Sequence, residues 1–113
     1  MDATTEFFQK LEARGHEPLL EKAKGTLRFD LANGKQKGAR WLVAIDKGEI
    51  AVSHRNASAD CVIRADRKLF DRITTGKENI VAAVLRGAMH IEGDRELIAF
   101  FQRLFPAPPK EAS

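Results

Sequence analysis

The sequence offers little for covalent or metal chemistry. Cys61 is the single cysteine in 113 residues, so an intramolecular disulfide is excluded and a reducing compartment is expected. His16, His54 and His90 belong to different expected elements, and no HxxxH or carboxylate spacing would make a metal site. We therefore expect no metal, no other cofactor and no catalytic residue. An enzyme that uses Cys61 or a histidine is the weakest alternative, because no arrangement of nucleophile and base is recognisable.

Long apolar runs and targeting signals are also missing. No run approaches the length of a membrane span, and residues 1–15 lack the basic and then apolar order of a secretory signal. The last four residues, KEAS, are not a peroxisomal address. We therefore expect a cytoplasmic protein.

Neither positive nor negative charge is concentrated in one part of the chain. Nineteen Lys and Arg residues against sixteen Asp and Glu residues give a net charge of +3, spread along the chain. The basic stretch KQKGARW, residues 35–41, is better explained as a charged hairpin, and no nucleic-acid partner is expected. With 43% hydrophobic and 31% charged residues, the composition is that of a globular domain. We expect one domain over residues 1–105 and a flexible Pro-rich tail over 106–113.

Hydrophobic periodicity predicts an α+β fold. Leu27, Phe29 and Leu31 alternate with polar residues, as in a half-buried strand, and two further strands follow as an antiparallel meander. Asp66 and Asp94 stand where helix N-caps are expected. The helices are expected on one face of a twisted, mostly antiparallel five-stranded sheet. In chain order we expect a helix over 3–14, a turn of helix from Pro18 to a stop at Gly25, strands over 26–32, 40–46, 49–54 and 60–65, a helix that begins at Asp66 and ends at 74–76, a helix over 78–86, a strand over 88–92 and a last helix after Asp94.

The stretch LRGAMHIEGDRELIAFFQRLF, residues 85–105, is the most specific part of the chain. Gly87 and Gly93 enclose a short strand, and Asp94 begins a helix with an apolar stripe. The seven phenylalanines and one tryptophan are large side chains for a domain this small, and this stretch holds three of the phenylalanines. Such residues are typical of a packed core, but the same residues would line a cavity for an apolar ligand. The composition leaves both interpretations open.

The order of these segments resembles the sterol carrier protein 2 family of lipid-binding domains. The most specific similarity is a helix that ends in Gly87, a short strand, then Gly93 and Asp94 before an apolar helix. A second similarity is strand, Asp, helix and Thr-Gly over residues 63–76. The match covers about residues 20–105 and runs through GTLRFDLANG, RWLVAIDKGEIAV and ADCVIRADRKLFDRITTGKENIVAAVLRGAMHIEGDRELIAFFQRLF.

This resemblance implies an apolar tunnel between the five-stranded sheet and its helices. It also implies no catalytic residues, and a ligand that is a fatty acid, an acyl-CoA, a sterol or an isoprenoid-like lipid. The expected function is non-catalytic binding or transfer of such a hydrophobic molecule, with transient contact to a membrane or an enzyme. Each residue implied as a wall of the tunnel also fits a packed core. These residues are Phe29, Trp41, Val43, Ile45, Ile50, Val52, Phe70, Ile73, Val81, Val84, Leu85, Met89, Ile91, Leu97, Ile98, Phe101 and Leu104.

The chain also departs from the peroxisomal carriers of this family, since it lacks their targeting tripeptide. The alternative function is a ligand-free interaction or dimerisation module that assists a lipid-pathway enzyme. In that alternative the apolar stripe of the last helix is exposed, and it forms a homodimer or docks a partner.

Overall fold

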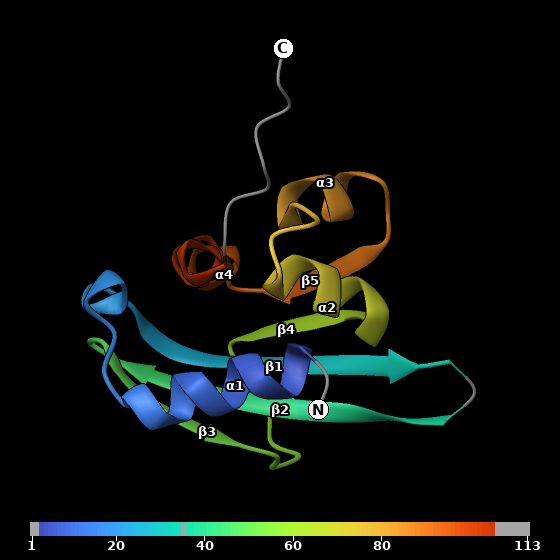
Figure 1. Cartoon of the computed structure of the whole chain (residues 1–113). Coiled ribbons are helices and arrows are strands. Elements are labelled where there is room, and N and C mark those ends of the chain that lie inside the picture. Colours follow the sequence, from blue (N-terminus) through green and yellow to red (C-terminus); the bar gives the residue numbers. More distant parts are fainter. Residues whose placement is uncertain (1–2, 35, 106–113) are drawn as a thin grey trace.

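Five strands form one mixed sheet in the computed structural model, which describes residues 3–34 and 36–105 (Figure 1). The strand order is β3-β2-β1-β4-β5; β1 and β4 are parallel and the other neighbours are antiparallel. The predicted α+β fold and mostly antiparallel sheet are confirmed, while the predicted tail lies outside the described residues. The elements are α1 (Ala3–Arg14), the 3-10 helix η1 (Pro18–Leu20), β1 (Lys24–Asn33), β2 (Gln36–Asp46), β3 (Glu49–Ser53), β4 (Cys61–Asp66), α2 (Arg67–Thr74), α3 (Ile80–Leu85), β5 (Met89–Gly93), α4 (Arg95–Phe101) and the 3-10 helix η2 (Gln102–Leu104).

Strands β1, β2 and β3 form the antiparallel meander that the alternation predicted. Phe29 of β1 pairs with Trp41 of β2, and Val43 of β2 pairs with Val52 of β3. Because side chains alternate between the two faces of a sheet, these four side chains lie on the same face. Strand β2 begins at Gln36, before the predicted start at residue 40, because its pairing with β1 continues to the end of that strand.

The predicted stop at Gly25 is wrong, because this glycine lies inside β1. Its φ of +148° is a backbone conformation that side-chain-bearing residues rarely adopt. A Cβ atom at this position would lie 2.6 Å from Cδ1 of Leu97. Glycine therefore allows α4 to pack directly on the beginning of β1.

Short polar side chains begin the helices of the C-terminal half. The Asp66 carboxylate accepts the backbone N–H of Lys68 at 3.1 Å, and the Asp94 carboxylate accepts that of Glu96 at 3.0 Å. Both predicted N-caps are thus confirmed. Asn79 caps α3 in the same way, with its side-chain oxygen accepting two backbone N–H groups. This cap makes α3 shorter than the predicted helix over 78–86.

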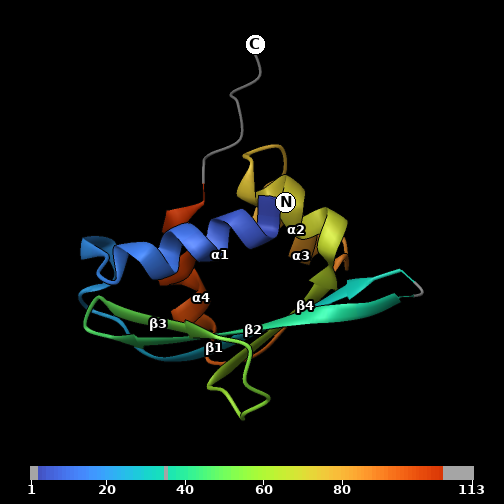
Figure 2. The ribbon, with the colours of Figure 1, turned by 60° about the horizontal axis from the view of Figure 1, so that its bottom comes forward.

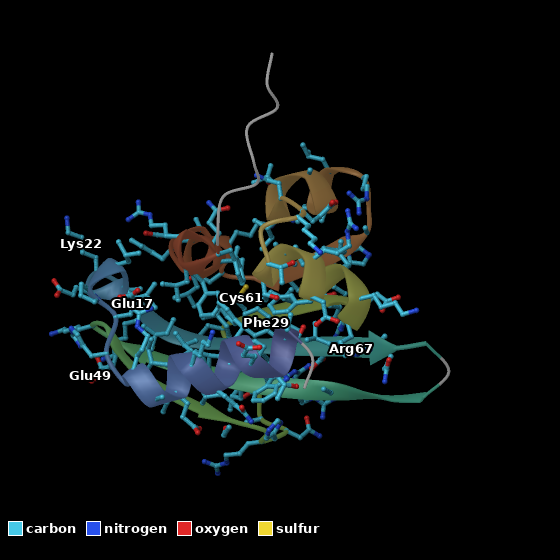
Figure 3. The ribbon with its side chains drawn as sticks, viewed as in Figure 1. Glu17, Lys22, Phe29, Glu49, Cys61 and Arg67 are labelled. Atoms are coloured by element: carbon cyan, nitrogen blue, oxygen red, sulfur yellow. The ribbon has the colours of Figure 1, made fainter. Side chains whose placement is uncertain are left out.

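One face of the sheet is covered by helices and holds the core (Figure 2). Phe8 of α1, Phe70 of α2 and Phe101 of α4 are fully buried, as is Phe29 of β1. Phe29 and Cys61 lie at the centre of the molecule, between the sheet and the helices (Figure 3). The periodicity of the strands therefore positions one continuous apolar layer under the helices.

The opposite face of the sheet is crossed by the segment between β3 and β4, residues 54–60 (Figure 2). Nη1 of Arg28 donates to the carbonyl oxygen of Ala57 at 3.1 Å and holds the middle of this segment. At its end, the Asp60 carboxylate accepts from the backbone N–H and the hydroxyl of Thr26 at 2.9 and 3.2 Å. This crossing makes β4 enter the sheet parallel to β1.

Candidate functional site

The space between the sheet and helices α1, α2 and α4 is filled by aromatic rings. Phe8 stacks on Trp41 and on Phe70, with ring centroids 4.7 and 5.7 Å apart. Phe29 contacts Phe70 and Phe101 with centroids 5.4 and 5.2 Å apart. These distances are those of favourable aromatic pairs. Rings from three helices and the sheet are therefore in contact at the centre of the molecule.

The residues predicted as tunnel walls fall into two groups. The larger group belongs to this core or packs against it, whereas the smaller group lines a groove at the surface. The core group consists of Phe29, Trp41, Val43, Ile45, Ile50, Val52, Phe70, Ile73, Met89, Leu97, Phe101 and Leu104. The groove group consists of Val81, Val84, Leu85, Ile91 and Ile98; of these, Ile98 also belongs to the core, and Val84 and Ile91 pack against it.

The groove lies between α3, β5 and α4, which are neighbours in space (Figure 1). Its volume is about 210 Å³, and Gln102 is the polar residue in an otherwise apolar lining. Three of its residues, Ile80, Ala99 and Gln102, were not predicted as walls. Ala99 and Gln102 are small and polar respectively, so neither carries an apolar signal in the sequence. Helical spacing places Gln102 beside both Ile98, four residues before it, and Ala99, three residues before it, and this spacing is a signal that could have found them.

Helix α3 gives the groove its exposed edge. Ile80 and Ala83 are 8% and 0% exposed and hold the helix against the protein. Val81 and Leu85 lie four residues apart on another side of the helix and are 51% and 83% exposed. Large apolar side chains with this exposure, next to an apolar depression, mark a surface suited to an apolar partner.

The apolar stripe of α4 is buried, so the expectation that the last helix exposes it is wrong. Leu97, Ile98 and Phe101 are 3%, 7% and 0% exposed. Helix α4 packs on β1 and β4, whereas α3 rests mainly on β5 at the edge of the sheet. The large apolar side chains exposed beside this groove therefore belong to α3.

The polar side chains considered for catalysis do not come together. His16, His54 and His90 are exposed and lie near η1, after β3 and in β5. Within the described part of the chain, no three His, Cys, Asp or Glu side chains gather where they could hold a metal ion. Among the helices of residues 3–34 and 36–105, none has the length and apolar content needed to span a membrane.

Cys61 is expected to be almost inert in the folded protein. Its side chain is fully buried. Burial, with a smaller contribution from the Asp94 carboxylate, raises the pKa of the thiol to about 11. At pH 8 we expect iodoacetamide to alkylate the native thiol at least about 100-fold more slowly than the unfolded thiol, because the thiolate reacts and is scarce. Mass spectrometry with and without denaturant measures both rates, and comparable rates would contradict a buried structural cysteine.

Comparison with known families and proteins gives a family match. Residues 6–106 match the model of the SCP-2 sterol transfer family. No curated protein matches the chain.

Solved structures share the fold at low sequence identity. The solution structure of sterol carrier protein domain 2 of Helicoverpa armigera has a TM-score of 0.74 and 21% identity, and the match covers 91% of this chain and 85% of that one. A ubiquinone synthesis protein, UbiJ-SCP2, has a TM-score of 0.65 and 18% identity, with 89% and 90% covered. The sec-alkylsulfatase Pisa1 from Pseudomonas sp. has a TM-score of 0.68 and 19% identity, with 90% of this chain but 16% of the sulfatase covered. The same fold thus occurs alone and within an enzyme.

Proposed function

The chain belongs to the SCP-2 sterol transfer family, and from this membership we propose that it binds the apolar part of a lipid in the groove between α3, β5 and α4. The ligand is a fatty acid, an acyl-CoA, a sterol or an isoprenoid-like lipid. Binding is non-catalytic, and the ligand is exchanged during transient contact with a membrane or an enzyme. We propose a site together with the function, since the fold alone supports several functions.

The observation that carries the proposal is the exposure of Leu85 beside the groove. A leucine that is 83% exposed gains little from folding and is free to contribute to binding. Covering such a side chain is worth about 1.5–3 kcal/mol. Val81 and Val84 extend the same apolar edge into the groove. The lining therefore provides affinity through apolar area and little specificity through hydrogen bonds.

The size of the groove sets how a lipid is held. Its volume of about 210 Å³ is below the range of roughly 300–1,000 Å³ typical of small-molecule pockets. We propose that the groove holds one end of the apolar chain and that a larger ligand separates α3 from α4. Ile98 then becomes a wall residue, because it both lines the groove and belongs to the core.

A fluorescent fatty-acid probe tests this proposal in delipidated protein. We expect saturable binding, and we expect Leu85→Glu to weaken it by about tenfold or more, because a carboxylate replaces apolar contact area. Leu19→Glu is the matched control, since Leu19 is 48% exposed on η1 and outside the groove. Both side chains are exposed, so both variants are expected to fold.

Two results of the probe titration would contradict the proposed site. The first is the absence of saturable binding by the parent protein for fatty-acid and sterol probes. The second is an equal loss of affinity in Leu85→Glu and Leu19→Glu, which would show that a change of charge anywhere on the surface is sufficient.

A ligand-free dimerisation module is the second candidate, and the exposed side chains of Val81 and Leu85 favour it. In that case α3 is the contact surface between two copies. Sedimentation equilibrium distinguishes the two candidates: a dimer that becomes a monomer in Leu85→Glu, together with no probe binding, supports the module. A monomer that binds the probe supports the lipid-binding function.

A further inference from the structure

The face of the sheet opposite the helices carries a cluster of arginines around one carboxylate. Arg28 and Asp30 lie in β1, Arg40 in β2 and Arg64 in β4. Nε and Nη2 of Arg28 donate to Oδ1 and Oδ2 of Asp30, both at 3.1 Å. Nε of Arg40 donates to Oδ1 at 3.0 Å, and Nε of Arg64 lies 3.9 Å from Oδ2. Three guanidinium groups from three neighbouring strands thus meet at one aspartate.

Arg28 alone provides a hydrogen bond to each carboxylate oxygen of Asp30. The fork of Arg28 already occupies both carboxylate oxygens in the bidentate geometry that is strongest for this pair. Partial burial raises the pKa of Asp30, but hydrogen bonds and charge from Arg28 and Arg40 outweigh it and hold that pKa below its usual value. Asp30 is therefore ionised at neutral pH and fixes the position of the surrounding guanidinium groups.

Arg40 and Arg64 keep donors for a further acceptor. A guanidinium group carries five N–H donors. Among the described residues, Arg40 donates to Asp30 alone, and its side chain is 40% exposed. Arg64 donates from Nη1 to Glu92 at 2.9 Å, and its side chain is 51% exposed. The terminal nitrogens of Arg40 in particular remain available at the surface.

These donors border a hollow of about 850 Å³ over β1, β2 and β4. Ala32 and Gly38 also line it and contribute almost no side chain. Arg40, Arg64 and Asp30 stand along it, and two positive charges against one negative charge leave the charged lining positive. The remaining lining residues are Leu31, Ala39, His54 and Ala65.

His54 forms a further part of the wall. Its Nδ1 lies 2.8 Å from the carbonyl oxygen of Arg40, and because a carbonyl oxygen can only accept, Nδ1 is the donor. The ring also packs against Trp41, with centroids 4.1 Å apart. These two contacts hold the imidazole in place.

We propose that this hollow binds a small organic molecule through a phosphate group placed between Arg40 and Arg64. Guanidinium forks match the oxygens of phosphate, and the net positive charge of the lining favours an anion. The volume is larger than inorganic phosphate requires and lies within the range of small-molecule pockets. The organic part of the ligand then lies over Ala32 and Gly38. This site is on the opposite face of the sheet from the lipid groove and does not depend on it.

Nuclear magnetic resonance titration of the full chain tests the site directly. We expect adenosine monophosphate to cause saturable shifts of the Arg40 Nε–H and of the Ala32 and Gly38 amides, and adenosine to cause none. Arg40→Gln should weaken the binding by about tenfold or more, since it removes a charged donor. Arg103→Gln is the matched control, because it makes the same change of charge on η2, outside the hollow.

Titrations with inorganic phosphate and glycerol 3-phosphate show whether the protein recognises the phosphate group alone or also the organic group attached to it. Equal affinity for all three phosphates assigns recognition to the phosphate group, and tighter binding of one ester assigns part of it to the attached group. The proposal is overturned if none of the three gives saturable shifts at these residues, or if Arg103→Gln weakens binding as much as Arg40→Gln. The absence of saturable shifts can be established with the parent protein alone. The proposal can therefore be tested even if a variant fails to fold.

Discussion

Replacing Phe29 by alanine is expected to lower the free energy of unfolding by about 3–5 kcal/mol. Phe29 is fully buried at the centre of β1 and contacts the rings of Phe8, Phe70 and Phe101. These rings come from α1, α2 and α4, so the shortened side chain would leave a cavity where all three helices meet the sheet. Rigid rings held by separate helices cannot move together to fill it, which places the loss near the upper part of this range.

Urea unfolding monitored by fluorescence measures this loss, because Trp41 is the single tryptophan and is buried against Phe8. Phe100→Ala is the matched control. Phe100 is only partly buried and lies 5.5 Å from the guanidinium of Arg103, so about 1 kcal/mol is expected. Equal losses in the two variants would contradict the central position of Phe29.

Replacing Gly93 by alanine is expected to cost about 3 kcal/mol or more. Gly93 has a φ of +94°, where a side chain adds roughly 1–2 kcal/mol of strain. Its Cβ would also collide with the backbone oxygen of Asp60. That oxygen accepts the backbone N–H of Asp94 at 2.7 Å, so the collision disturbs the junction of β4, β5 and α4. Forced overpacking of this kind adds about 1–3 kcal/mol.

Gly87 provides the matched control at the other end of β5. Its φ of +77° is similar, but a Cβ there would meet nothing within 4 Å. Gly87→Ala should therefore cost only the strain of about 1–2 kcal/mol. Thermal and urea unfolding of both variants compare the two positions. A Gly87→Ala variant as unstable as Gly93→Ala would show that the conformation, and not the close approach to Asp60, makes glycine necessary.

Much of the fold could be predicted because its signals are local. The alternation of Leu27, Phe29 and Leu31 identified β1 and its buried face, and the carboxylates of Asp66 and Asp94 identified two helix starts. Each of these signals concerns neighbours in the sequence. The wrong prediction at Gly25 concerns a contact between distant residues. Leu97 packs against this glycine and leaves no room for a side chain there, which no neighbouring residue in the sequence indicates.

The two surface sites could be predicted only in part. Periodicity groups residues on one side of a helix but does not say which side is covered, so the exposure of Val81 and Leu85 had no signal in the sequence. The arginine cluster was not predicted at all. Arg40 and Arg64 meet at Asp30 because β1 pairs with β2 on one side and with β4 on the other. No local pattern specifies the parallel β1–β4 pairing.

The parallel β1–β4 pairing also joins two continuous parts of the chain. The first part contains the meander of β1, β2 and β3, and the second contains β4, β5, the helices α2, α3 and α4, and the 3-10 helix η2. The lipid groove lies entirely in the second part, in segments that surround the edge strand β5. Because α3 rests mainly on this edge strand, we expect α3 to open locally at a cost below the free energy of global unfolding. The contacts of Phe29 with Phe70 and Phe101, which join the two parts, would stay intact while α3 moves away for a ligand.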